Sequence, residues 1–218
     1  MNRLLLLRSA GSESDLGPDV DVVTTHEVVP IPAALDEVAR YDAAGAHLVV
    51  TSQETARLIG DVRRFRHVHA AGEATARALK VRAPEAPGAA GILAALPDDL
   101  TGERFLWPHA ADADPLLEEA LAARGAAVEA PVVYEKVPRP LPEPLLHRFR
   151  EGAYAAVAVA SLSALDAFLA ALGPAPRPPV RWGVIGPESA KAFRERGLPE
   201  PLVPARARLI DLISLLRS

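Results

Sequence analysis

Two turns with the same residue pattern, Gly-x-x-Thr/Ser-Ala, are the first features of the sequence that could do chemistry. One runs from Gly72 to Thr75 and the other from Gly186 to Ser189, and each follows a short apolar stretch. Such a turn directs backbone N–H groups and a hydroxyl to the start of a helix, where unpaired amides and the helix dipole bind carboxylate or phosphate. The hydroxyls could instead serve only to cap their own helices. The pattern therefore predicts anion binding or capping at both turns.

Further hydroxyl side chains follow two other apolar stretches. Thr51 and Ser52 follow one of them, and Ser161 and Ser163 follow the other. Because ligands of parallel sheets bind beyond the carboxyl ends of the strands, we expect these four residues to contact substrate, with helix capping as a compatible role. Neither serine motif matches Gly-x-Ser-x-Gly, and no histidine follows in a hydrolase order, so a nucleophilic triad is not predicted.

Tyr134 is one of three tyrosines and lies in a β-rich segment, residues 132–138. A phenol can donate a hydrogen bond or a proton, although its ordinary pKa of about 10 makes it a weak acid at neutral pH. An isolated tyrosine can also be a simple packing residue. We expect Tyr134 to face a cleft, where it could act as a donor.

The histidines do not suggest a metal site. His67 and His69 share one face of a predicted strand without a third ligand at useful spacing, which favours solvated strand histidines. His109 is followed by Asp112 and Asp114, of which one is expected to cap a helix. Since the chain contains no cysteine, disulfides and thiolate sites are excluded.

The composition is that of an ordinary globular protein. Of the 218 residues, 50% are hydrophobic and 24% are charged, with a net charge of −4 that argues against a general nucleic-acid binder. Neither a Gly-x-Gly-x-x-Gly turn nor a phosphate-binding Gly-x-x-x-x-Gly-Lys loop is present. No apolar stretch reaches the roughly 20 residues that span a bilayer, and Leu4–Leu7 is too short for a signal peptide. We therefore expect a cytoplasmic protein without a membrane segment.

Short apolar runs alternate with helical patterns, which predicts an α/β fold with mostly parallel strands flanked by helices. A helix is predicted over residues 114–124, ending at Gly125, and another over residues 207–217 with a buried apolar face. The predicted strands are residues 4–7, 47–50, 68–71, 105–107, 155–159 and 182–185.

An internal duplication organises these elements. Each half of the chain runs strand, hydroxyl-bearing turn, helix, strand, Gly-x-x-Thr/Ser turn and helix, which predicts two similar lobes. Residues 22–30 and 132–138 are both β-rich, both end in Val-Pro, and are predicted to form a two-stranded ribbon between the lobes. The first lobe would then be discontinuous, with residues 1–28 and 138–218, and the second would be residues 29–137.

In this order the motifs resemble those of the uroporphyrinogen-III synthase family, and the resemblance covers nearly the whole chain. The matching segments are the strand ending in Arg8, Val-Thr-Ser at 50–52, Ala-Gly-Glu-Ala-Thr-Ala at 71–76, Leu-Leu-Glu-Glu-Ala-Leu at 116–121, Gly125, Val-Val-Tyr at 132–134, Ala-Ser-Leu-Ser at 160–163 and Ile-Gly-Pro-Glu-Ser-Ala at 185–190.

The resemblance implies an enzyme with its active site between two lobes and no metal or organic cofactor. We also expect the protein to be a monomer. The resemblance further implies the substrate hydroxymethylbilane, a linear tetrapyrrole with eight carboxylates, which is closed with loss of water and inversion of the last ring. Tyr134 matches the family's conserved tyrosine and is assigned as the donor to the leaving hydroxyl. The carboxylates are assigned to Arg8, Thr51, Ser52, Gly72, Thr75, Ser161, Ser163, Gly186 and Ser189.

A second hypothesis is a non-catalytic two-lobed module that binds a small ligand with the same fold. It is motivated by departures from the family pattern, such as Val50 in place of phenylalanine and Trp107-Pro108-His109 in place of an arginine-rich turn.

Overall fold

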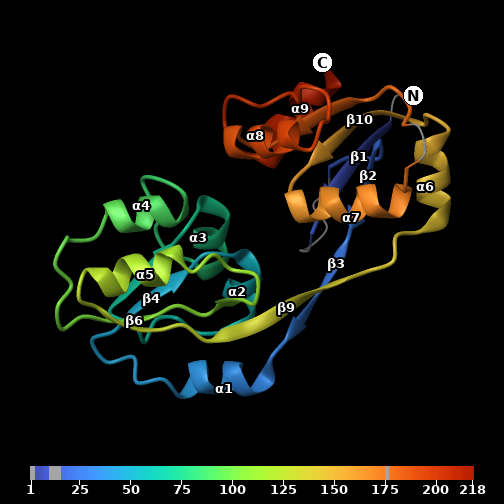
Figure 1. Ribbon diagram of the computed structural model, residues 1–218. Helices are drawn as coiled ribbons and strands as arrows, with labels where there is room; N and C mark the ends of the chain where they lie inside the picture. The colour runs from blue at the N-terminus through green and yellow to red at the C-terminus, as the bar shows by residue number, and fades with distance from the viewer. Residues whose placement is uncertain (1–2, 10–15, 175–176) are drawn as a thin grey trace. The chain divides into compact units, whose positions relative to one another are not determined.

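The computed structural model describes residues 3–9, 16–174 and 177–218, and its contacts divide the chain into two compact units (Figure 1). Unit 1 consists of Met1–Glu27 with Val137–Ser218, and unit 2 consists of Val28–Lys136. Each unit has its own parallel sheet and its own hydrophobic clusters.

The sheet of unit 1 contains four parallel strands in the order β11-β10-β1-β2. The strands are Arg181–Val184 (β11), Tyr154–Val159 (β10), Arg3–Arg8 (β1) and Val20–Thr24 (β2). Leu4–Leu7 is buried along its whole length because helices cover both faces of the sheet. This double burial explains why the central strands read as continuous apolar runs and not as alternating patterns.

The helices of unit 1 divide between the two faces of its sheet. Glu143–Arg150 (α6), Leu162–Leu172 (α7) and Pro187–Glu195 (α8) pack on one face, and Leu209–Arg217 (α9) packs on the other. Gly183 allows α9 to approach closely, because a Cβ at this position would lie 2.7 Å from Cδ1 of Leu212. The predicted apolar face of the last helix is confirmed at Leu212, Ile213 and Leu216, whereas Ile210 is exposed.

Unit 2 is built around a second parallel sheet, in the order β5-β4-β6-β8. The strands are His67–Ala70 (β5), His47–Val50 (β4), Arg104–Leu106 (β6) and Ala127–Glu129 (β8). On one face lie Pro32–Arg40 (α1), Gln53–Leu58 (α2) and Glu73–Leu79 (α3), and on the other lie Gly88–Ala94 (α4) and Leu116–Ala123 (α5).

A third sheet has three strands in the order β3-β9-β7. They are His26–Pro30 (β3), Val132–Pro138 (β9) and His109–Ala110 (β7), and β7 pairs with β9 in parallel. The strand predicted over residues 22–30 was wrong in its first part, since residues 20–24 form β2 beside β1. Thr25 lies between the two strands, and its N–H and its hydroxyl both donate to the carbonyl of Arg8. That β3 and β9 form a ribbon linking the units stays a prediction.

The predicted fold class is confirmed, with mostly parallel sheets flanked by helices. The repeated order is also present, as β4-α2-β5-α3 in unit 2 and as β10-α7-β11-α8 in unit 1. Gly125 follows the end of α5, as predicted, with a positive φ of 90° that favours glycine. The N-cap position of α5 is Pro115, one residue later than predicted, but the carboxylate of Asp114 accepts from the N–H of Leu116 and so caps the first amide of the helix.

The strand histidines of unit 2 form a cluster that includes His47. Nδ1 of His47 lies 3.0 Å from Nε2 of His69, and Nε2 of His47 lies 3.3 Å from a carboxylate oxygen of Glu103. His67 is exposed, as predicted, but His69 is partly buried and His47 is buried. Burial, followed by the neighbouring histidines, lowers the pKa of His69 to about 4, and burial also lowers the pKa of His47.

These depressed pKa values predict that unit 2 loses stability in mild acid. As the pH falls below about 6.5, the unfolded chain takes up protons that His47 and His69 in the folded chain do not, until the pH reaches the folded pKa of His69 near 4. The free energy of unfolding should therefore decrease between pH 6.5 and 5, which urea titrations can measure. His69→Gln should weaken this dependence, and His147→Gln, on an exposed helix position of unit 1, should leave it unchanged. An identical slope in wild type and His69→Gln would contradict the assignment.

Candidate functional site

In unit 2, three positions that follow strands lie at one edge of the parallel sheet. Thr51 follows β4, Gly72 lies two residues beyond β5, and Trp107 follows β6. Since these strands run parallel, their carboxyl ends meet at the same edge. The indole N–H of buried Trp107 donates to Oγ1 of Thr51 across 3.4 Å, which joins the turns after β4 and β6 directly.

Ser52 begins helix α2 and is the centre of a small hydroxyl cluster. Its backbone is extended, and its Oγ accepts from the N–H of Thr55 at 3.0 Å, so the predicted capping role is present. The same Oγ lies 2.9 Å from Oγ1 of Thr55 and 3.1 Å from the phenol oxygen of Tyr134. Sequence reasoning missed Thr55, although its position three residues after a capping serine is the position that a cap contacts.

Tyr134 reaches Ser52 from β9, where it pairs with Ala110 of β7. Tyr134 was expected to face a cleft, but it is buried. Only 1% of the residue is exposed, and it packs among Val50, Leu106 and Val133. Burial raises the pKa of the Tyr134 phenol, and the hydrogen bond with Ser52 opposes this shift without reversing it. The phenol is therefore neutral at physiological pH.

In the first Gly-x-x-Thr turn, Gly72 and Thr75 differ in how far they are buried. Gly72 is the N-cap of α3, and a Cβ added to it would meet no atom within 4 Å, so its backbone borders open space. Thr75 is only 5% exposed and points into the fold. Space therefore remains beside the backbone of Gly72, whereas the side chain of Thr75 is buried.

Unit 1 repeats this arrangement at the carboxyl edge of its own sheet. Arg8 ends β1, Ser161 follows β10 as the N-cap of α7, and Gly186 follows β11 as the N-cap of α8. Ser161 makes no capping bond with its side chain but lies 2.7 Å from the hydroxyl of Ser163, oxygen to oxygen. A Cβ on Gly186 would also meet no atom within 4 Å.

Ser189 and Arg8 complete the predicted set in unit 1, and both are half-buried. Ser189 is the third residue of α8, and neither Ser189 nor Thr75 provides a side-chain cap for its helix. Simple capping therefore does not explain either Gly-x-x-Thr/Ser turn. Together the two edges offer open amides and small hydroxyls, which are suited to hold carboxylates.

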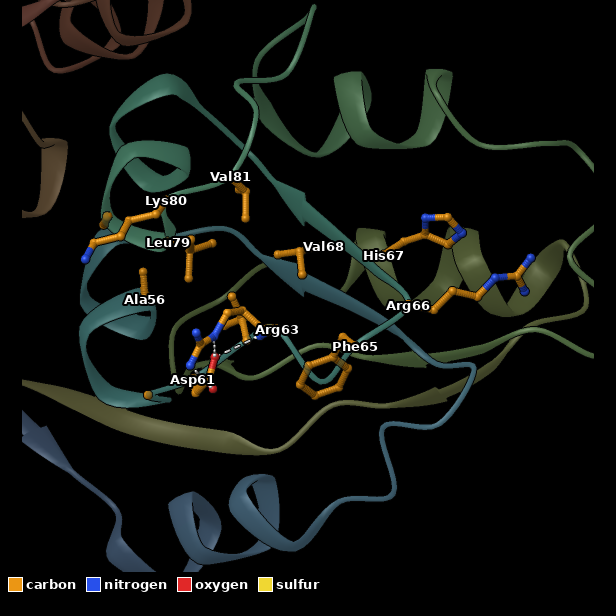
Figure 2. Close-up of a pocket in the computed structure, with 13 residues that line it drawn as sticks. Ala56, Asp61, Arg63, Phe65, Arg66, His67, Val68, Leu79, Lys80 and Val81 are labelled. Carbon is orange, nitrogen blue, oxygen red and sulfur yellow. Dashed lines mark hydrogen bonds and ion pairs between the residues drawn. The ribbon is translucent and has the colours of Figure 1, made fainter.

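A surface pocket elsewhere in unit 2 does not involve the predicted residues. It has a volume of about 660 Å³ and lies between α2, α3 and the start of β5 (Figure 2). Val68, Leu79 and Lys80 are among the residues that line it. Arg63 and Asp61 also line it and pair with each other at 2.9 Å. This pocket adjoins the amino end of β5, whereas Gly72 lies beyond the carboxyl end.

The part of the chain that the structure describes contains neither a cluster of metal-ligating side chains nor a membrane-spanning helix. Within residues 3–9, 16–174 and 177–218, no group of three or more histidine, aspartate or glutamate side chains is arranged to hold a metal ion. Over the same ranges, every helix is too short or too polar to cross a bilayer.

Comparison with known proteins identifies the family. The family model described as uroporphyrinogen-III synthase HemD matches residues 7–214. A comparison with curated protein sequences gives no significant match. Among solved structures, uroporphyrinogen-III synthetase from Helicobacter pylori is similar, with a TM-score of 0.68 and 16% identity over 99% of this chain and 98% of that chain. A mutant uroporphyrinogen III synthase from Thermus thermophilus has a TM-score of 0.61 and 20% identity over 99% of this chain and 96% of that chain.

At these identities the two structures establish the fold, and the family model carries the assignment. Since its match spans nearly all of the 218 residues, the chain belongs to the uroporphyrinogen-III synthase family.

Proposed function

We propose that this protein cyclises hydroxymethylbilane, with loss of water and inversion of the last pyrrole ring. The observation that carries the proposal is the family match over residues 7–214, which contains both strand edges with their open glycine turns. The same match does not favour a non-catalytic binding module.

The proposed reaction does not require an ionised side chain. The pyrrole nitrogen supplies the electron pair that expels the hydroxyl, so the protein must mainly fold the chain and assist departure of the oxygen. A neutral hydrogen-bond donor is suited to that task, and the raised pKa keeps the Tyr134 phenol neutral. We propose that the neutral phenol of Tyr134 assists the departure of the hydroxyl.

The eight carboxylates of the substrate need many donors. We propose that the amides at Gly72 and Gly186 hold some of them, because both backbones border open space at a helix start. Half-buried side chains at the same two edges would hold the remaining carboxylates. They are the guanidinium of Arg8 and the hydroxyls of Thr51, Ser52, Ser161, Ser163 and Ser189. Thr75 would contribute through its backbone, since its side chain is buried.

Other parts of the proposal concern the whole protein. We propose a discontinuous first lobe of residues 1–28 and 138–218, an inserted lobe of residues 29–137, and a monomer that works in the cytoplasm. The division of contacts at Glu27/Val28 and Lys136/Val137 supports the lobe boundaries. Light scattering on the purified protein would measure the mass in solution.

The activity has a direct test. Purified protein supplied with hydroxymethylbilane should yield the inverted isomer, uroporphyrinogen III, faster than the spontaneous reaction yields the non-inverted isomer I. Chromatographic separation of the oxidised products distinguishes the two. Product containing isomer I alone, at the spontaneous rate, would reject the proposed function.

Removing the phenol hydroxyl should lower turnover without unfolding the protein. In Tyr134→Phe the ring still fills its apolar site, so we expect kcat to fall by about 10²-fold or more with KM nearly unchanged. Tyr154→Phe is the matched control, because that phenol donates to Asp21 in unit 1, away from the strand-end residues. Wild-type kcat in Tyr134→Phe would remove this residue from catalysis.

A charge at the open glycines should repel the substrate. Gly72→Asp and Gly186→Asp are compatible with the extended backbones, whose φ angles are −167° and −150°, and aspartate is a favoured N-cap. The isosteric Gly→Asn variants add the same bulk without the charge. Because a carboxylate close to a bound carboxylate costs about 1–4 kcal/mol, KM should rise about tenfold from asparagine to aspartate, and added salt should reduce the difference. Equal KM values for the two variants at both positions would mean that no carboxylate binds there.

A further inference from the structure

Three hydroxyl side chains of unit 2 form a cluster in which two members are buried and the third is partly exposed. Tyr134 is 1% exposed and Thr55 is fully buried, whereas Ser52, which lies between them, is half-buried. The phenol oxygen of Tyr134 lies 3.1 Å from Oγ of Ser52, and the apolar cluster that includes Val50 and Leu106 surrounds the ring. A substrate at the sheet edge therefore meets the hydroxyl of Ser52 before that of Tyr134.

The hydrogen-bond capacity of Ser52 limits how this cluster can be arranged. A hydroxyl has one hydrogen and two lone pairs, and the N–H of Thr55 occupies one lone pair of Ser52 at 3.0 Å. Oγ1 of Thr55 and the phenol of Tyr134 therefore cannot both donate to Ser52. If Tyr134 donates, both lone pairs are filled, and the Ser52 hydrogen is directed at Thr55 or at a ligand.

We infer that Ser52 is the group that donates a hydrogen bond to the leaving hydroxyl, and that Tyr134 is a positioning residue acting through it. The inference rests on the proposed function and deepens it. With Tyr134 donating to Ser52, Oγ1 of Thr55 is the acceptor that remains for the hydrogen of Ser52 in the free protein. When substrate binds, rotation of this one hydroxyl redirects the hydrogen to the leaving oxygen, while Tyr134 keeps its bond to Ser52.

The buried phenol strengthens Ser52 without losing its proton. Burial raises the pKa of Tyr134, so the phenol remains a donor over the physiological range. A hydroxyl that accepts a hydrogen bond becomes a better donor, because the bonds in a chain polarise one another. Two accepted bonds, from Tyr134 and from the N–H of Thr55, therefore favour donation by Ser52.

The step balances without an ionised side chain. The carbon–oxygen bond of the hydroxymethyl group breaks, its electron pair leaves with the oxygen, and the lone pair of the pyrrole nitrogen forms the compensating double bonds. The oxygen leaves as water after gaining one proton, and the ring nitrogen gives up one proton. Ser52 and Tyr134 are neutral before and after the step.

A double-mutant cycle on the full chain tests the inference. Ser52→Ala and Tyr134→Phe should each lower kcat by about 10²-fold with little change in KM, and the double variant should be no slower than either single variant. Ser52→Thr, which keeps the hydroxyl and the cap, should restore most of the activity. Ser214→Ala removes a hydroxyl from an exposed position on α9 and should match wild type.

Two outcomes would overturn the inference. Wild-type kcat in Ser52→Ala beside a slow Tyr134→Phe would mean that the phenol contacts substrate directly, and multiplying effects in the double variant would mean that the residues act separately. Should loss of the cap unfold Ser52→Ala, Ser52→Gly replaces it, since glycine is tolerated at an N-cap. If wild type forms no isomer III, the proposed function fails, whereas an active wild type with an unaffected Ser52→Ala rejects this inference alone.

Discussion

Parallel pairing of strands is the constraint on which the rest of this structure depends. When β4, β5 and β6 run in the same direction, the turns that follow them must meet at one edge, and this brings Thr51, Gly72 and Trp107 together. The same pairing of β1, β10 and β11 gathers Arg8, Ser161 and Gly186 in unit 1. Residues that are distant in the sequence thus lie at one edge of a sheet, because parallel strands all end at that edge.

The apolar interiors of these strands in turn shape the chemistry at the edge. Leu48, Val50 and Leu106 are buried, and Tyr134 packs among them with its hydroxyl turned to Ser52. An apolar surrounding disfavours the phenolate and leaves a neutral donor. A reaction in which pyrrole nitrogens supply the electrons is matched to such donors, because it needs hydrogen bonds at the departing oxygen more than it needs charge.

The two units repeat the same order of strands, turns and helices, but the side chains in their turns make different hydrogen bonds. The turn after β4 holds a capping serine bonded to a buried phenol, whereas the turn after β10 holds Ser161, which bonds Ser163 and caps nothing through its side chain. The glycine turns are more alike, since both leave open space where a side chain would be. The two glycine turns thus share one local geometry, whereas the two hydroxyl turns differ in their hydrogen bonds.

The sequence by itself determined the fold class, the repeated order of strands, turns and helices, and the family. These are local properties: a short apolar run such as Leu4–Leu7, bounded by polar residues, indicates a buried strand, and a glycine directly after a helical pattern, such as Gly125, indicates a helix end. Short motifs in a fixed order identify a family for the same reason.

Tertiary structure alone decided which side chains are accessible. Tyr134 and Ser52 are 82 positions apart, and no local pattern reveals that their hydroxyls meet or that the phenol is buried. The partnership of His47 with His69 and the burial of Thr75 likewise follow from strand register and helix packing. Burial and hydrogen bonding across such separations depend on how whole elements pack, and packing is a property of the folded chain.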